Sequence, residues 1–137
     1  MMAQTIMIRL LREPEPPNTD GSAVRFGLQD KKGAMHDGIA RADGLIAFDF
    51  DVTVTGGADA SPDFGGPFVS GPRGERFVYL AWQRQNGAGF MNRIKVRLAD
   101  IDWSLIQATE GKRLEADLRG VTTGGGKRPV EWRVADA

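Results

Sequence analysis

The chain has 137 residues, with 18 basic and 18 acidic side chains and no cysteine. This length predicts a single domain, residues 1–137, that buries about two thirds of its unfolded surface. The balanced charge argues against nucleic-acid and anionic-membrane partners. The lack of cysteine excludes disulfides, thiolate chemistry and cysteine-based zinc sites, and it favours the cytoplasm as the location.

The first predicted element is a strand over residues 5–11, where apolar side chains alternate. Arg9 and Arg12 interrupt the apolar run of residues 1–12, and a proline-rich segment, residues 13–22, follows it, so neither a signal peptide nor a membrane span is expected. A second alternating segment, residues 24–29, leads into an Asp-Lys-Lys-Gly turn at residues 30–33, which predicts a hairpin. The polar residues 34–44 are expected to be irregular.

The clearest strand signal covers residues 45–55. One face carries five apolar side chains in strict alternation: Ile46, Phe48, Phe50, Val52 and Val54. The opposite face is mainly polar and includes Asp49 and Asp51. This pattern indicates a half-buried antiparallel strand, and residues 56–62 are then expected to form a polar loop.

The most apolar strand, residues 76–84, follows a loop rich in proline and glycine. Within that loop, Pro72 and Gly74 hold the positions that a type I turn prefers. Both faces of the strand are apolar, with Phe77, Tyr79 and Ala81 on one and Val78, Leu80 and Trp82 on the other. The strand is therefore expected in the interior of the sheet, covered on both sides.

The last part of the chain is predicted to contain three strands and one helix. Residues 93–98 alternate and are expected to pair with residues 76–84 across a turn at 85–89. Asp102 is a candidate N-cap for a short helix that Gly111 ends. The remaining predicted elements are strands at residues 114–119 and 130–134, separated by a flexible turn at 124–129.

Together these seven strands predict an all-β, mainly antiparallel fold with one short helix. The short loops fit a single-domain β-sandwich or a small β-barrel, and the sequence leaves both open. Two acidic rows and one basic row lie on outer strand faces: Asp49/Asp51, Glu115/Asp117 and Arg93/Lys95/Arg97. At least one acidic row is expected beside the basic row, because opposite charges across strands contribute about 0.2–1 kcal/mol per pair.

Two adjacent segments carry a family resemblance. Residues 67–72 read Pro-Phe-Val-Ser-Gly-Pro and residues 76–82 read Arg-Phe-Val-Tyr-Leu-Ala-Trp. This combination resembles the central signature of a small bacterial domain family of unknown function. Flanking segments at residues 26–30, 48–50, 93–96 and 101–103 fit it as well. The resemblance covers most of the chain and implies one intact domain, without implying an activity.

A binding site is the favoured functional hypothesis. Three arginines surround the proline/glycine loop and the strand after it, with two aromatic residues between them: Arg73, Arg76, Arg84, Tyr79 and Trp82. Arginine beside an aromatic ring can grip a carboxylate or phosphate. Tyr79 and Trp82 alternate to opposite faces, so one site would need a bulge or a barrel mouth, and both rings can instead be core residues. The sequence thus favours a soluble, non-catalytic module for a small anionic or polar ligand, with no cofactor.

Two other classes remain open. An unpaired edge strand or an exposed apolar patch would make the chain a protein-interaction or self-associating domain, such as a homodimer. An enzyme would have to use Asp49, Asp51 or His36. Since His36 is the only histidine, a multi-histidine metal site is excluded, and the two aspartates fit a solvated strand face better than an acid–base pair.

Overall fold

The computed structural model describes residues 4–14, 24–57, 60–84, 90–121 and 130–136, which form two β-sheets and one short helix, α1 (Trp103–Gln107). The six-stranded sheet contains β1 (Gln4–Arg12), β4 (Ile39–Ala40), β5 (Ile46–Gly57), β6 (Ala60–Gly65), β9 (Lys112–Asp117) and β10 (Trp132–Asp136). The four-stranded sheet contains β2 (Val24–Gln29), β3 (Met35–His36), β7 (Phe77–Arg84) and β8 (Phe90–Arg97).

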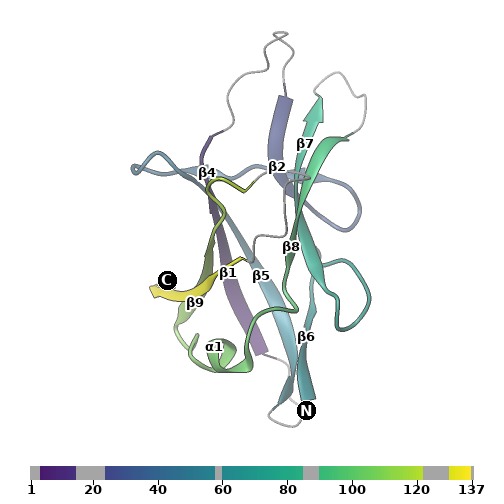
Figure 1. Ribbon diagram of the computed structural model, residues 1–137, viewed down its shortest axis with the longest axis vertical. Helices are drawn as coiled ribbons and strands as arrows, with labels where there is room; N and C mark the ends of the chain where they lie inside the picture. Colours follow the sequence, from purple (N-terminus) through teal and green to yellow (C-terminus); the bar gives the residue numbers. More distant parts are fainter. Residues whose placement is uncertain (1–3, 15–23, 58–59, 85–89, 122–129, 137) are drawn as a thin grey trace.

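The strand order is β10-β9-β1-β5-β4 in the larger sheet, where β6 also pairs with β5, and β3-β2-β7-β8 in the smaller one. Every pairing between these strands is antiparallel except that of β1 with β9, which is parallel. Figure 1 shows the two sheets as separate layers, with β1 and β5 in one and β7 and β8 in the other. The predicted all-β, mainly antiparallel fold is confirmed.

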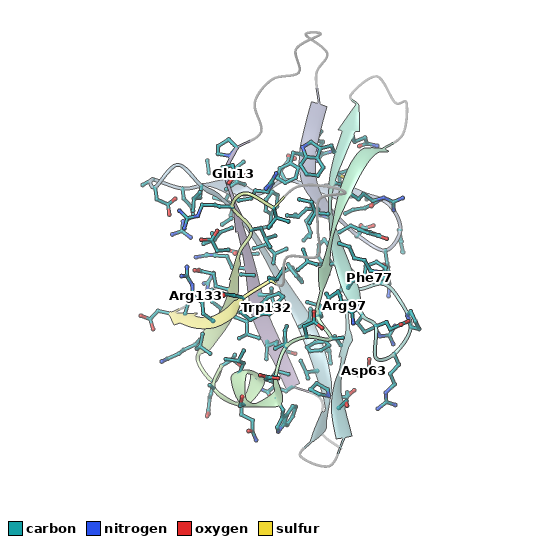
Figure 2. The ribbon with its side chains drawn as sticks, viewed as in Figure 1. Glu13, Asp63, Phe77, Arg97, Trp132 and Arg133 are labelled. Carbon is teal, nitrogen blue, oxygen red and sulfur yellow. The ribbon has the colours of Figure 1, made fainter. Side chains whose placement is uncertain are left out.

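The core lies between the sheets, because both contribute alternate side chains to one buried cluster. Phe48 and Val52 come from β5, while Val78 and Leu80 come from β7, and all four are at most 2% exposed. Side chains fill the space between the layers in Figure 2. Of the two architectures that the sequence left open, these strands form the β-sandwich.

β7 is an interior strand, as expected, since it pairs with β2 on one side and β8 on the other. Ala81, on its outer face, is as fully buried as Leu80 on its inner face. The loop before β7 folds back onto it, because Ser70 and Phe77 exchange two backbone hydrogen bonds. The predicted hairpins of β2 with β3 and of β7 with β8 are both present.

Some predicted elements are corrected. Residues 34–44 are not wholly irregular, since they contain β3 and β4, and the expected loop at 56–62 instead includes the end of β5 and the start of β6. Asp102 holds the N-cap position without a side-chain hydrogen bond, and α1 ends at Gln107, before Gly111. The turns expected at 85–89 and 124–129 lie outside the described residues.

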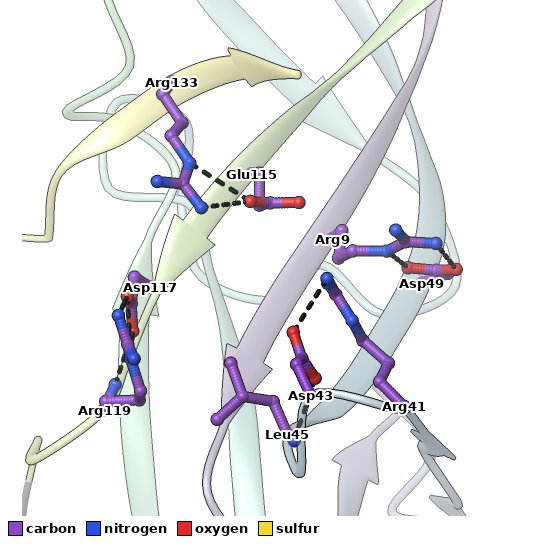
Figure 3. Close-up of polar contacts among 9 residues, drawn as sticks. All are labelled: Arg9, Arg41, Asp43, Leu45, Asp49, Glu115, Asp117, Arg119 and Arg133. Carbon is purple, nitrogen blue, oxygen red and sulfur yellow. Dashed lines mark hydrogen bonds and ion pairs between the residues drawn. The ribbon is translucent and has the colours of Figure 1, made fainter. Parts of the chain in front are cut away.

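The prediction that an acidic row lies beside the basic row of β8 is wrong, because the acidic rows belong to the other sheet. Four charged side chains of alternating sign instead occupy one register across β10, β9, β1 and β5: Arg133, Glu115, Arg9 and Asp49. Figure 3 shows Arg9 facing Asp49 and Arg133 facing Glu115. The four members of this charge ladder cancel one another's charge on the outer face of the six-stranded sheet.

Two glycines of the loop before β7 allow a test of its packing. Gly71 and Gly74 both have positive φ angles, of 92° and 86°. A Cβ on Gly71 would lie 2.7 Å from the Phe77 ring and 2.9 Å from the Glu75 carbonyl oxygen, whereas one on Gly74 would meet nothing within 4 Å. In urea denaturation we expect Gly74→Ala to cost about 1 kcal/mol through backbone strain alone, and Gly71→Ala about 2 kcal/mol or more. Equal losses would contradict the packing of this loop on Phe77.

Candidate functional site

Arg76, at the entrance to β7, links the two sheets. Its Nε donates a hydrogen bond of 3.1 Å to Asp63 of β6, and its Nη1 donates to the Gly71 carbonyl oxygen. The hydrogen bond from Arg76 lowers the pKa of Asp63, and the nearby charge of Arg73 adds to this effect. Arg76 is thus engaged within the protein, while Arg73 is an exposed loop residue.

Trp82 closes one end of the core. Its ring lies 4.7 Å from that of Phe26, which meets Phe48 of the opposite sheet edge-on at 5.4 Å. The buried Arg12 guanidinium lies 5.5 Å from the Trp82 ring and donates a hydrogen bond to the Leu118 carbonyl oxygen. These contacts favour the core interpretation of Trp82.

Tyr79 lies on the other face of β7, pointing away from the core. The Tyr79 and Phe77 rings meet edge-on at 4.8 Å. The Arg93 guanidinium lies 4.7 Å from the Tyr79 ring centre, and the Lys95 ammonium lies 4.3 Å from that of Phe77. In register, Tyr79 is opposite Lys95 and Phe77 is opposite Arg97, so each cation covers the ring diagonal to it.

We call these five side chains the outer basic face: Phe77, Tyr79, Arg93, Lys95 and Arg97. The three cations of β8 are exposed, and the two rings beneath them are half-buried. Arg97 also forms an ion pair of 3.5 Å with Asp100, in which both side chains are at least half exposed. Lys95 forms no ion pair with any residue in the described ranges. The face therefore presents positive charge above an aromatic floor.

The structure does not bring the five predicted ligand-binding residues together. Tyr79 lies on the outer face, Trp82 lies at the end of the core, and Arg73 and Arg76 lie by the loop. The side chain of Arg84 lies outside the described residues. Phe77, Arg93, Lys95 and Arg97 were not predicted as site residues, although their alternation along two strands expected to pair already placed them on one face.

A family model described as a family of unknown function, DUF5990, matches residues 5–136. The chain belongs to the DUF5990 family. This confirms the resemblance to a domain family of unknown function that the signature before and within β7 indicates. No curated protein and no solved structure matches this DUF5990 chain.

The catalytic alternative receives little support from the geometry of the DUF5990 chain. Asp49 accepts hydrogen bonds of 2.7 and 2.9 Å from Arg9, which lower its pKa, so it is a poor proton donor or acceptor near neutral pH. His36 lies in the other sheet, where its Nε2 is 3.0 Å from Asp30. The hydrogen bond with His36 is the main cause of the lowered pKa of Asp30.

The described residues of the DUF5990 chain contain no group of three or more histidine, cysteine, aspartate or glutamate side chains placed to hold a metal ion. They also contain no helix with the length and apolar character needed to cross a bilayer.

Proposed function

We propose that this domain is a non-catalytic binding module that holds a small anionic ligand on the outer basic face. The observation that carries the proposal is the Lys95 ammonium, which lies 4.3 Å from the Phe77 ring centre without an ion-pair partner in the described part of the chain. Three arginines of the six-stranded sheet, Arg9, Arg113 and Arg133, each face a carboxylate by contrast. Within the outer basic face, Lys95 is the cation best placed to take a ligand's negative charge.

The rings beneath the cations support this function physically. A neutral ring attracts a cation without cancelling its charge, so the Phe77 ring holds the Lys95 ammonium in place and leaves its charge available to a ligand. Ordering long side chains in advance reduces the entropy that a ligand must overcome. A carboxylate or phosphate group can then be held by the ammonium and guanidinium donors.

Replacing Lys95 by glutamine should separate ligand binding from folding. We expect a carboxylate or phosphate ligand, found by thermal shift with a panel of anionic metabolites, to bind Lys95→Gln about tenfold more weakly. Lys112→Gln is the matched control, since it removes the same charge from an exposed lysine of the six-stranded sheet and should leave the affinity unchanged. Dissociation constants from calorimetry would check both.

Two outcomes would contradict the proposal. Equal weakening by both variants would show that the ligand responds to net charge alone. A panel without any hit, together with a melting temperature that rises with protein concentration, would favour self-association instead. The side chain best placed for that alternative is Ile39 on β4, which is 66% exposed.

A further inference from the structure

β8 is an edge strand of the four-stranded sheet. It pairs with β7 on one side, and within the described residues no backbone group is hydrogen-bonded to its other side. An unpaired strand edge offers backbone N–H and C=O groups that an extended chain can use to add another strand. No described residue therefore occupies the outer edge of β8, and another strand can pair there.

The charges on β8 restrict what can pair there. Arg93, Lys95 and Arg97 are exposed and alternate along the strand, so neighbouring charges lie about 7 Å apart. A second copy of β8 would bring like charges opposite one another, which destabilises strand pairing. An added strand with acidic side chains at every second position would instead have the same spacing and opposite charge.

We propose that β8 accepts an extended acidic peptide segment as an additional strand, with its alternate carboxylates facing Arg93, Lys95 and Arg97. The inference rests on the proposed function in using the same cations, and goes beyond it because the carboxylates belong to an acidic polypeptide and not to a small anion. Backbone pairing supplies affinity, and the cations select the acidic side chains.

Asp100 competes with the incoming peptide for Arg97. It is 57% exposed and lies 3.5 Å from the Arg97 guanidinium, so a carboxylate of the added strand must replace it. Asp100→Asn removes this competitor from an exposed position and should tighten peptide binding. Lys95→Gln removes a central cation and should weaken it.

The experiment uses the full chain and a blocked peptide, Thr-Glu-Val-Glu-Val-Glu-Thr, with affinity measured by fluorescence anisotropy. Two further peptides carry backbone N-methyl groups, one on the glutamates and the other on the valines. Successive residues of a strand point their backbone groups to opposite sides, so only one of these two sets can face β8. We expect one methylated peptide to lose at least about tenfold in affinity and the other to bind like the parent.

Supporting results are this unequal loss, tighter binding by Asp100→Asn and weaker binding by Lys95→Gln. Equal binding of all three peptides would overturn strand addition. So would a result in which small anions or a single-stranded oligonucleotide bind but the peptide does not. Lys95-dependent binding of small anions would then leave the proposed function intact. Failure of both the peptide and the anion panel would overturn both proposals.

Discussion

Asp49→Asn is expected to lower the free energy of unfolding by about 2–4 kcal/mol, because it removes the carboxylate shared by two arginines. Arg9 donates two hydrogen bonds to Asp49, and Arg113 lies 3.5 Å from it with a side chain only 9% exposed. Without the negative charge, two guanidinium groups remain close together on the sheet, one of them buried. Urea denaturation at neutral pH would measure the loss.

Asp51→Asn is the matched control for this prediction. Asp51 lies on the same face of β5 two residues further on, is exposed, and forms no ion pair with any described residue. Its loss should stay within about 0.5 kcal/mol. Equal effects at the two positions would show that the charge ladder does not stabilise the sheet.

The pH dependence gives an independent test of the same ion pair. Arg9 holds the pKa of Asp49 below its ordinary value of 3.8. For a carboxylate whose pKa is lower in the folded state, the stabilisation is complete above the unfolded pKa and is lost as the pH falls through the folded pKa. The stability difference between the native chain and Asp49→Asn should therefore be constant above about pH 5 and shrink below about pH 4. A difference that does not change with pH would contradict the assigned cause.

Alternating polarity predicted most of the strands and the hairpins of β2 with β3 and of β7 with β8, but not the other strand partners. It located β5 and β7 and gave the correct inward faces, because a buried sheet face demands an apolar residue at every second position. It could not show that β1 pairs in parallel with β9, since these strands are about a hundred residues apart and carry no joint signal. For the same reason, at least one acidic row was expected beside the basic row of β8, whereas Asp49 in fact accepts hydrogen bonds from Arg9 and Glu115 accepts them from Arg133.

The candidate site was only partly accessible from the sequence. Strand parity separates Tyr79 from Trp82, and the structure follows this separation. The role of Arg76 depends on Asp63 in β6, whose segment contains Pro62 and lacks alternation, so neither the strand nor the ion pair was foreseen. β6 forms because it pairs with β5, and that tertiary contact outweighs its local sequence.

Phe48→Ala is expected to lower the free energy of unfolding by about 3–5 kcal/mol, because it leaves a cavity where aromatic rings of the two sheets are in contact. Phe48 of β5 is 2% exposed and meets Phe26 of β2 edge-on at 5.4 Å, and Phe26 in turn packs on Trp82 at 4.7 Å. Phe48→Leu keeps most of the buried volume and should lose less than about 2 kcal/mol.

A double-mutant cycle that combines Phe48→Ala with Trp82→Ala would test whether Trp82 is part of the core, because it measures the energetic coupling between the two side chains. Because Phe26 lies between the two side chains, their losses should be non-additive by about 0.5 kcal/mol or more. Anion binding should survive Trp82→Ala at temperatures where the variant stays folded, since Trp82 faces away from the outer basic face. If ligand affinity fell while the two losses were additive, Trp82 would belong to a binding site and not to the aromatic chain that joins the sheets.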